Sequence, residues 1–377
     1  MLTGLASLVG LAVSGCGGGG SGGSQGSVVG THQAGIQAAQ STATSSAACQ
    51  AIAQNAGASS PDNGFYWEVG DAGGVIASGT VTPPGGVNYT RDTALAIASA
   101  SKWVYGAYVV ELLGSVQNGV GVVPASDVQY LNFTSGYDNM SDTACSISDT
   151  VDTCLAQSNG AGQLNGDRTL GDIGKFYYNS GHLEHLASSV MGQGGDTVVD
   201  LSSALVDTFA SSGVMINPLT LPGNGSPTSL FLLPIAAGGI YSNATNYAAF
   251  LQGMLRSSNP LRMRYFLQST ANDAYAVCAN PSACPNTALQ SPLPSTLNWH
   301  YSITHWIEDD PTTGDGAYSS PGKDGFYPWI DAGLTYYGII SRFDNNPGAT
   351  ASDAPYYKSA MCGAAIRKAF LSGVPQS

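Results

Sequence analysis

The chain has 377 residues and carries 12 Lys and Arg against 25 Asp and Glu, which gives a formal charge of −13. This acidic balance argues against a nucleic-acid-binding protein, because a phosphate-binding surface needs a basic patch. Hydrophobic residues make up 43% and charged residues only 10%, the opposite of a disordered chain's composition. No apolar run reaches the roughly eighteen residues of a membrane span, so we expect a soluble, acidic, extracytoplasmic globular protein.

The amino-terminal segment carries the pattern of an export signal. Residues 2–13 are small and apolar, a length typical of a signal-peptide h-region and too short to cross a bilayer. The run leads into the sequence VSGC, which ends at Cys16 and resembles the lipobox of bacterial lipoproteins, although no Lys or Arg precedes the run. We expect a signal peptide over residues 1–16, acylation of Cys16 and a lipid-anchored protein of the bacterial cell envelope. A secreted protein with an incidental Cys is the alternative.

The next segment has the composition of a tether. Residues 17–30 are almost entirely Gly and Ser, which gives a flexible linker without side chains that can pack. We therefore expect the folded domain to span residues 31–377 and the linker to hold it off a membrane surface.

The first part of this domain predicts helices around a hairpin. Residues 32–56 are rich in Ala, Gln and Ser without Pro, and predict a helix. Residues 65–81 hold two β-rich runs around Gly-Asp-Ala-Gly-Gly, a hairpin signal. Residues 93–113 carry apolar residues at helical spacing and predict a second helix.

The remainder predicts that the chain returns to the same sheet. The middle, about 114–292, mixes helical pieces with long Gly, Asn and Ser loops. The last part predicts three strands and a final helix, over 299–308, 325–330, 334–343 and 356–371. We expect one sheet built from both chain ends, an α/β part of about 31–113 and 293–377, with a helical insert between them.

Six cysteines follow the lipobox, an even number that suits an oxidising compartment. Two pairs flank loops short enough for a disulfide to close, Cys145 with Cys154 and Cys278 with Cys284. Cys49 and Cys362 are then left over, one near each end of the folded region. Zinc binding is the alternative, but no CxxC occurs and the five His are scattered. We expect no metal and no cofactor.

Ser99 and Lys102 form a candidate nucleophile and base. Residues three apart lie on the same side of a helix, so the Ser99 hydroxyl and the Lys102 amine can meet. A serine is a weak nucleophile unless a neighbour takes its proton, and a buried lysine can do so because desolvation lowers its pKa. Taken alone the pattern is weak, since Ser320 and Lys323 repeat it around a helix-breaking Pro-Gly.

Further blocks strengthen this interpretation. They are Leu131-Asn132-Phe133-Thr134-Ser135-Gly136-Tyr137, Tyr177-Tyr178-Asn179-Ser180-Gly181 after Gly174-Lys175-Phe176, Gly238-Gly239-Ile240-Tyr241-Ser242 and Tyr247-Ala248-Ala249-Phe250-Leu251. In this order and at these separations, with the SxxK pair before them, they resemble the penicillin-recognising serine hydrolases. The nearest branch looks like the class C β-lactamases with their related esterases and D-peptidases. The resemblance covers roughly residues 60 to 345.

The resemblance implies a role for each matching residue. Ser99 matches the nucleophile and Lys102 the partner that shares its proton. Tyr177 matches the tyrosine that assists proton transfer to the leaving group, because it alone has the Tyr-x-Asn spacing; the adjacent Tyr178 is the competing choice. Asn179 matches the polar residue that orients Lys102 and the substrate.

The third motif of the family, Lys-Thr-Gly or His-x-Gly, is altered in this chain. The best match is Ser320-Pro321-Gly322, so Ser320 stands where a cation usually stands. Lys323 follows the motif glycine Gly322, where the backbone N–H completes an oxyanion hole with that of Ser99. We expect the Lys323 side chain to point away from Ser320, and the aromatic side chains of Tyr318, Phe326, Tyr327 and Trp329 to favour an apolar or neutral acyl group if they line the cleft.

The resemblance also implies the fold and the remaining disulfide. We expect a β-lactamase/transpeptidase-like α+β sandwich, with an antiparallel sheet flanked by the terminal helices and a mainly helical insert. The first and last helices of this fold lie side by side, which predicts a Cys49–Cys362 bond beside Cys145–Cys154 and Cys278–Cys284. The histidines are expected to serve packing: His182, His185, His300 and His305.

Three functions are compatible with these residues. The first is a carboxylic-ester hydrolase that forms an acyl-enzyme on Ser99 and takes neutral or apolar acyl substrates. The second is a β-lactamase, D-peptidase or other amide hydrolase, oligoamides included. The third is a non-catalytic sensor lipoprotein, which needs no matched nucleophile and base. We expect a monomer whose partners are a small ester or amide substrate and, through Cys16 alone, the membrane.

Overall fold

The fold is known from a computed structural model that describes residues 26–53, 64–346, 348 and 350–377. The predicted signal peptide, Cys16 and most of the predicted tether lie outside these ranges. Within them, every helix is too short or too polar to cross a bilayer.

An eight-stranded antiparallel sheet forms the centre of the fold, in the order β10-β12-β13-β14-β15-β16-β1-β2. The strands are β1 (Phe65–Asp71), β2 (Gly74–Val81), β10 (Val277–Cys278), β12 (His300–Ser302), β13 (His305–Glu308), β14 (Ala317–Ser319), β15 (Tyr327–Ile330) and β16 (Tyr337–Ser341). Strand β1 pairs with β16, so one sheet does form from both chain ends, as predicted. It also takes β10 from within the predicted insert.

The predicted hairpin over residues 65–81 is present as β1 and β2. Its turn is closed by Asp71, whose Oδ1 accepts the Gly73 N–H at 2.7 Å. Gly74 follows with a φ of 140°, a conformation that only glycine adopts freely. Strand β1 is buried along nearly its whole length, so side chains on both faces of the sheet are covered here.

The sequence predicts one strand over 299–308 and no strand between residues 308 and 325. Both predictions are wrong. The first run is two strands, β12 and β13, which turn at Ile303 and Thr304 with φ of 38° and 67°. No Gly or Asn marks this turn; instead it is held by the 131–132 segment, where the Asn132 side chain accepts the Ile303 N–H at 2.7 Å and the Leu131 carbonyl accepts the Thr304 N–H at 2.9 Å. Strand β14 has only three residues, too few for an alternation to be recognised.

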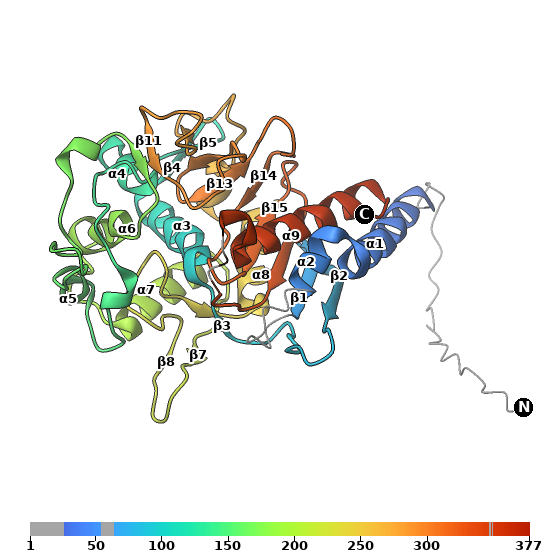
Figure 1. Cartoon of the computed structure of the whole chain (residues 1–377), viewed down its shortest axis with the longest axis horizontal. Helices are drawn as coiled ribbons and strands as arrows, with labels where there is room; N and C mark the ends of the chain where they lie inside the picture. The colour runs from blue at the N-terminus through green and yellow to red at the C-terminus, as the bar shows by residue number, and fades with distance from the viewer. Residues whose placement is uncertain (1–25, 54–63, 347, 349) are drawn as a thin grey trace, which may run out of the picture.

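The terminal helices cover one face of the sheet, as predicted. They are α1 (Gly26–Ser45), α2 (Ala47–Ala53) and α9 (Pro355–Ser372). Figure 1 shows α1 and α2 beside α9, next to β1 and β2. Helix α1 begins inside the predicted 17–30 tether, because extending an existing helix fixes one residue for each hydrogen bond gained. The Cys49–Cys362 disulfide joins α2 to α9, which confirms that pairing.

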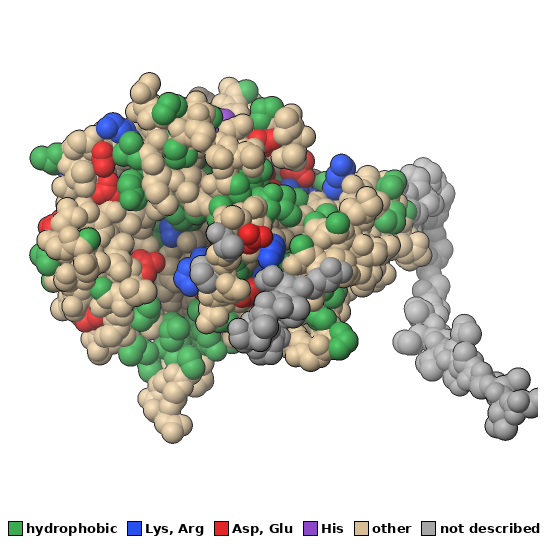
Figure 2. Space-filling model, in the orientation of Figure 1, with side chains coloured by type: hydrophobic (Ala, Val, Ile, Leu, Met, Phe, Trp, Pro, Cys, Tyr) green, Lys and Arg blue, Asp and Glu red, His purple; other side chains and the backbone are tan. Residues whose placement is uncertain are grey.

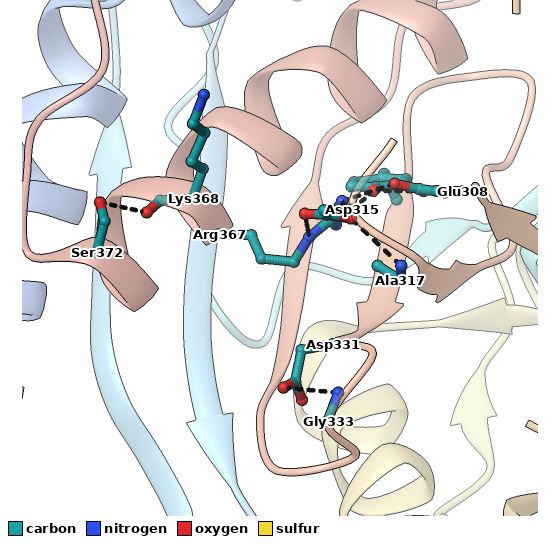
Figure 3. A network of polar contacts seen from close by, with 9 residues as sticks. Glu308, Asp315, Ala317, Asp331, Gly333, Arg367, Lys368 and Ser372 are labelled. Carbon is teal, nitrogen blue, oxygen red and sulfur yellow. Dashed lines mark hydrogen bonds and ion pairs between the residues drawn. The ribbon is translucent and has the colours of Figure 1, made fainter. Parts of the chain in front are cut away.

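Arg367, on α9, joins this helix to the sheet through buried polar contacts. Its guanidinium lies 2.7 Å from Glu308 on β13 and 2.7 Å from Asp315, and it donates to the Tyr327 hydroxyl at 3.0 Å. Figure 3 shows Arg367 turned toward these carboxylates and the neighbouring Lys368 turned away from them. Arg367 and Glu308 are both buried, so each supplies the charge that the other needs away from water.

The segment between the two halves of the sheet is helical and loop-rich. Its elements are α3 (Ser101–Leu113), β4 (Ser115–Gln117), β5 (Val120–Val122), α4 (Ala125–Leu131), α5 (Val151–Leu155), β6 (Phe176–Tyr177), α6 (Gly181–His185), α7 (Val198–Ser211), β7 (Leu219–Thr220), β8 (Thr228–Ser229), β9 (Tyr241–Ser242), α8 (Ala244–Leu255) and β11 (Ala288–Gln290). Helices α5, α6 and α7 lie at the end of the molecule opposite α1 (Figure 1). The disulfides Cys145–Cys154 and Cys278–Cys284 are present as predicted.

The predicted helix over 93–113 is shorter than expected. Residues Leu95–Ala96 form strand β3, which pairs with β9, and the α-helix begins only at Ser101. Between them lies a 3₁₀ turn, Ala98–Ala100. This junction of strand and helix carries Ser99.

Candidate active site

Ser99 sits in a tight turn that several segments hold in place. Ala98, just before it, has a φ of 46°, a left-handed conformation that costs a residue with a Cβ free energy. The turn is fixed from two sides: the Tyr247 hydroxyl donates to the Ala100 carbonyl at 2.9 Å, and the Ser320 hydroxyl donates to the Ser99 carbonyl at 3.0 Å. Ser99 itself remains partly exposed.

Lys102 lies one helical turn further on and meets Ser99 as the spacing predicts. Its Nζ is 3.0 Å from the Ser99 Oγ and donates to the Ala237 carbonyl at 2.9 Å. The residue is 2% exposed. Burial lowers the pKa of the Lys102 amine to about 8, against the opposing charges of Asp142 and Glu184. About a tenth of this amine is therefore free base at pH 7, and about half of it at pH 8, which is the form that a proton acceptor for Ser99 requires.

The tyrosine beside Ser99 is Tyr178, so the assignment of Tyr177 is corrected. The Tyr178 hydroxyl lies within hydrogen-bonding reach of the Ser99 side chain, and Lys102 Nζ lies 4.9 Å from the Tyr178 ring centroid. Residues two apart in an extended segment share a face. Tyr178 thus points to the same side as the buried Phe176, whereas the Tyr177 carbonyl accepts a hydrogen bond from His182 at 2.9 Å.

Burial raises the pKa of the Tyr178 phenol, while hydrogen bonds to Ser99 and Trp306 lower it. The net rise keeps this hydroxyl protonated at neutral pH, so it can donate a proton. Trp306, on β13, stacks on Tyr178 with ring centroids 5.4 Å apart. The sequence does not point to Trp306, because residues 299–308 are expected to form a single strand and the separate strand β13 is not recognised.

Asn179 does not orient Lys102. Its side-chain carbonyl accepts the N–H groups of Met140 (3.2 Å) and Gly181 (2.8 Å), and its NH₂ donates to the Met140 carbonyl at 3.1 Å. These bonds tie Asn179 to the backbone of a neighbouring loop. Counted from Tyr178, the third position of the Tyr-x-Asn motif is Ser180, whose hydroxyl donates to Asp142 Oδ2 at 3.1 Å.

The altered third motif lies beside Ser99, as predicted. A Cβ on Gly322 would stand 2.2 Å from the Ile97 carbonyl oxygen, so only glycine fits against the turn. Ser320 is buried and already bonded to the Ser99 backbone. The Lys323 side chain is 72% exposed and lies 2.6 Å from Asp324.

Two hollows lie next to Ser99, and both are lined by Ser99 and Lys323. The smaller, about 60 Å³, is also bordered by Tyr178, Trp306 and Tyr356. The larger, about 300 Å³, has an apolar wall made by Ala96, Ala98, Leu232, Leu233, Ile235 and Phe343. Figure 2 shows hydrophobic side chains gathered at the base of the β7–β8 hairpin. A group bonded to Ser99 therefore has room on two sides.

The four aromatic residues that would favour an apolar acyl group if they lined the cleft are not among the residues that border either hollow. Tyr318, Phe326, Tyr327 and Trp329 are all buried in the core. Trp329, for example, lies under Arg367, with the guanidinium carbon 5.0 Å from the ring centroid. Their strands alternate sides, and both faces of this sheet are covered, so an aromatic residue near Gly322 in sequence is not thereby near the cleft.

Three of the four histidines expected to serve packing, His182, His185 and His305, contact aromatic rings, whereas the partly exposed His300 bonds to Asp309 at 3.0 Å. His182 stacks on Phe133 and bonds the Ser135 hydroxyl at 2.7 Å, and burial lowers its pKa to about 3. His185 stacks on Tyr137, and His305 is buried with its pKa lowered to about 4. In the described residues no group of three His, Cys, Asp or Glu side chains converges as metal ligands.

No protein-family model and no curated protein matches the sequence. Solved structures do match the fold. A putative β-lactamase from Bacteroides dorei DSM 17855 is 19% identical, with a TM-score of 0.53 over 81% of this chain and 92% of that one. EstCE1, a hydrolase with promiscuous acyltransferase activity, is 13% identical, with a TM-score of 0.53 over 86% and 99%.

The D-amino acid amidase from Ochrobactrum anthropi SV3 is 12% identical, with a TM-score of 0.55 over 85% of this chain and 99% of that one. The chain therefore has the β-lactamase/transpeptidase-like fold that its motifs predict. It shares this fold with the putative β-lactamase, the acyltransferase-active hydrolase and the amidase named above.

Proposed function

We propose that this protein is a serine hydrolase that forms an acyl-enzyme on Ser99 and acts on neutral carboxylic esters. The observation that carries the proposal is the 3.0 Å contact between the Ser99 hydroxyl and a buried Lys102 whose pKa is lowered to about 8. A binding protein has no need of a nucleophile matched to a base in this way.

The reaction follows from the positions of these groups. The free amine of Lys102 takes the Ser99 proton as Oγ attacks the ester carbonyl. The backbone N–H groups of Ser99 and Lys323 stabilise the oxyanion that forms. Tyr178 gives its proton to the leaving alcohol and recovers one from Lys102 as the carbonyl reforms. Water then attacks the carbonyl of the acyl group on Ser99. Lys102 and Tyr178 accept its proton and return one to Ser99 Oγ, so the carboxylic acid leaves and the serine hydroxyl is restored.

Charge in the cleft favours a neutral substrate. Ser320 offers a hydroxyl, already used on the Ser99 carbonyl, where the family's cation receives a carboxylate. Lys323 is paired with Asp324, and Asp142 adds a negative charge to the wall of the larger hollow. A charge-assisted hydrogen bond contributes about 1.5–3 kcal/mol, so a substrate carboxylate loses at least tenfold in recognition. Amide hydrolysis with the same residues is the alternative function.

A hydrolysis panel tests the proposal. We expect the purified protein to turn over p-nitrophenyl acetate and butyrate, to act weakly on nitrocefin and D-alanyl peptides, and to lose nearly all turnover in Ser99→Ala. Efficient nitrocefin hydrolysis with p-nitrophenyl butyrate left untouched would favour a β-lactamase. Normal ester turnover by Ser99→Ala would remove Ser99 from the mechanism.

The site of action is proposed as well. Acylation of Cys16 would hold the enzyme at the cell envelope, with the Gly- and Ser-rich residues 17–25 between the lipid anchor and α1. Metabolic labelling with a radioactive fatty acid, in the wild type and in Cys16→Ser, tests this.

A further inference from the structure

A buried carboxylate stands behind the Ser99–Lys102 pair. Glu184, on α6, is 0% exposed, and its two oxygens accept the N–H groups of Ala236 and Ala237 at 3.0 Å each. Among the described residues it forms no ion pair. Burying a carboxylate costs free energy unless hydrogen bonds or an opposite charge compensate, because the group is removed from water.

The segment that Glu184 holds is the one that contacts Lys102. The Ala237 N–H binds Glu184, and the Ala237 carbonyl accepts from Lys102 Nζ at 2.9 Å. We propose that Glu184 is a positioning residue of the hydrolase: it fixes the Ala236–Ala237 backbone so that the Ala237 carbonyl holds the Lys102 amine against Ser99. This inference rests on the proposed function.

The rest of the turn cannot do this without Glu184. The N–H groups of Ile235, Gly238 and Gly239 bond to carbonyls inside the same turn, at 2.7–3.2 Å. Those of Ala236 and Ala237 point out of it, to Glu184. Without a carboxylate there, two buried donors would lose their acceptors, and the turn would have to rearrange. The same turn also contributes Ile235 and Gly238 to the wall of the larger hollow.

Glu184 also acts on Lys102 through its charge. The titratable groups that face Lys102 are Asp142, Tyr178, His182 and Glu184. A negative Glu184 favours the ammonium form of Lys102, against the effect of burial. Burial raises the pKa of Glu184 to about 8, and the two amide donors and Lys102 oppose that rise. Glu184 therefore loses its negative charge over the same pH range in which Lys102 gains its proton. Replacing the carboxylate by a neutral group should still move the protonation of Lys102 to lower pH, but by only part of the effect of a full charge.

Glu184→Gln in the full chain is the test, with Glu111→Gln as the matched control. Glu111 is a half-buried carboxylate that also accepts a backbone N–H, from Arg262, but it lies at the far end of α3. The two readouts against pH are kcat/KM on p-nitrophenyl acetate and the rate at which a fluorophosphonate labels Ser99. For Glu184→Gln we expect a plateau at least tenfold lower and an acid limb shifted to lower pH by up to about one unit, since Glu184 is partly protonated in that range. Glu111→Gln should keep the wild-type plateau and the wild-type acid limb.

A purely structural role for Glu184 would leave the acid limb unmoved, so an unchanged limb overturns the inference. Glu184→Asp keeps the charge but shortens the reach by one methylene, so it should lower the plateau and keep the limb near the wild-type pH. If Glu184→Gln does not fold, a wild-type plateau in Glu184→Asp overturns the inference instead. Failure of the wild type to label at Ser99 would overturn the proposed function along with it, whereas a labelled wild type with unchanged variants overturns this inference alone.

Discussion

Two adjacent tyrosines give the sharpest test of the site. Tyr178→Phe and Tyr177→Phe each remove one hydroxyl from neighbouring positions, so the pair forms its own control. The Tyr178 hydroxyl is the one within reach of Ser99, and burial keeps it protonated at neutral pH by raising its pKa. Loss of a general acid typically slows a reaction about 100- to 10,000-fold. This corresponds to about 3–5 kcal/mol of transition-state free energy.

The assay is kcat/KM for p-nitrophenyl butyrate and for butyrate esters of more basic alcohols, which are poorer leaving groups. We expect Tyr178→Phe to lose at least 100-fold, and more as the leaving alcohol becomes more basic, because that alcohol then depends more on a proton donor. Phenylalanine keeps the ring that stacks on Trp306, so the fold should survive and melt near the wild-type temperature. Tyr177→Phe should stay within about twofold. Loss of activity in Tyr177→Phe with a normal Tyr178→Phe would refute the geometric assignment.

Three further predictions concern protonation and stability. Ester hydrolysis should fall about tenfold per unit below pH 8, because the Lys102 amine acts as free base and its pKa is lowered to about 8; a limb near 6.5 would point to a histidine instead. Arg367→Met should lower the unfolding free energy in urea by about 3–5 kcal/mol, by leaving the buried Glu308 without its cation, whereas the exposed Lys368→Met should change it little. Replacing Cys49 and Cys362 together by Ser should cost up to about 5 kcal/mol, because that bond closes a loop of sequence separation 313; an unchanged denaturation midpoint would contradict this.

The sequence by itself determined the fold class, the SxxK pair and the disulfides. Ser99 and Lys102 could be paired because a helical period fixes which side chains share a face, and the 3₁₀ turn before Ser101 preserves that relation. The two short disulfide loops close over six and nine residues, so distance along the chain already limits the partners. Glycine at position 322 was recognisable as part of a motif, although its reason is a contact with Ile97 that only the fold creates.

The tertiary structure alone decided which tyrosine and which polar groups surround Ser99. Tyr177 and Tyr178 differ by one position, and in an extended segment one position reverses the side of the chain on which a side chain lies. That side is set by the burial of Phe176 and by pairing with β11, a strand more than 100 residues away in sequence. Asp142 and Glu184 approach Lys102 from separate elements, and a sequence motif records spacing along one segment but carries no information on which distant segments converge.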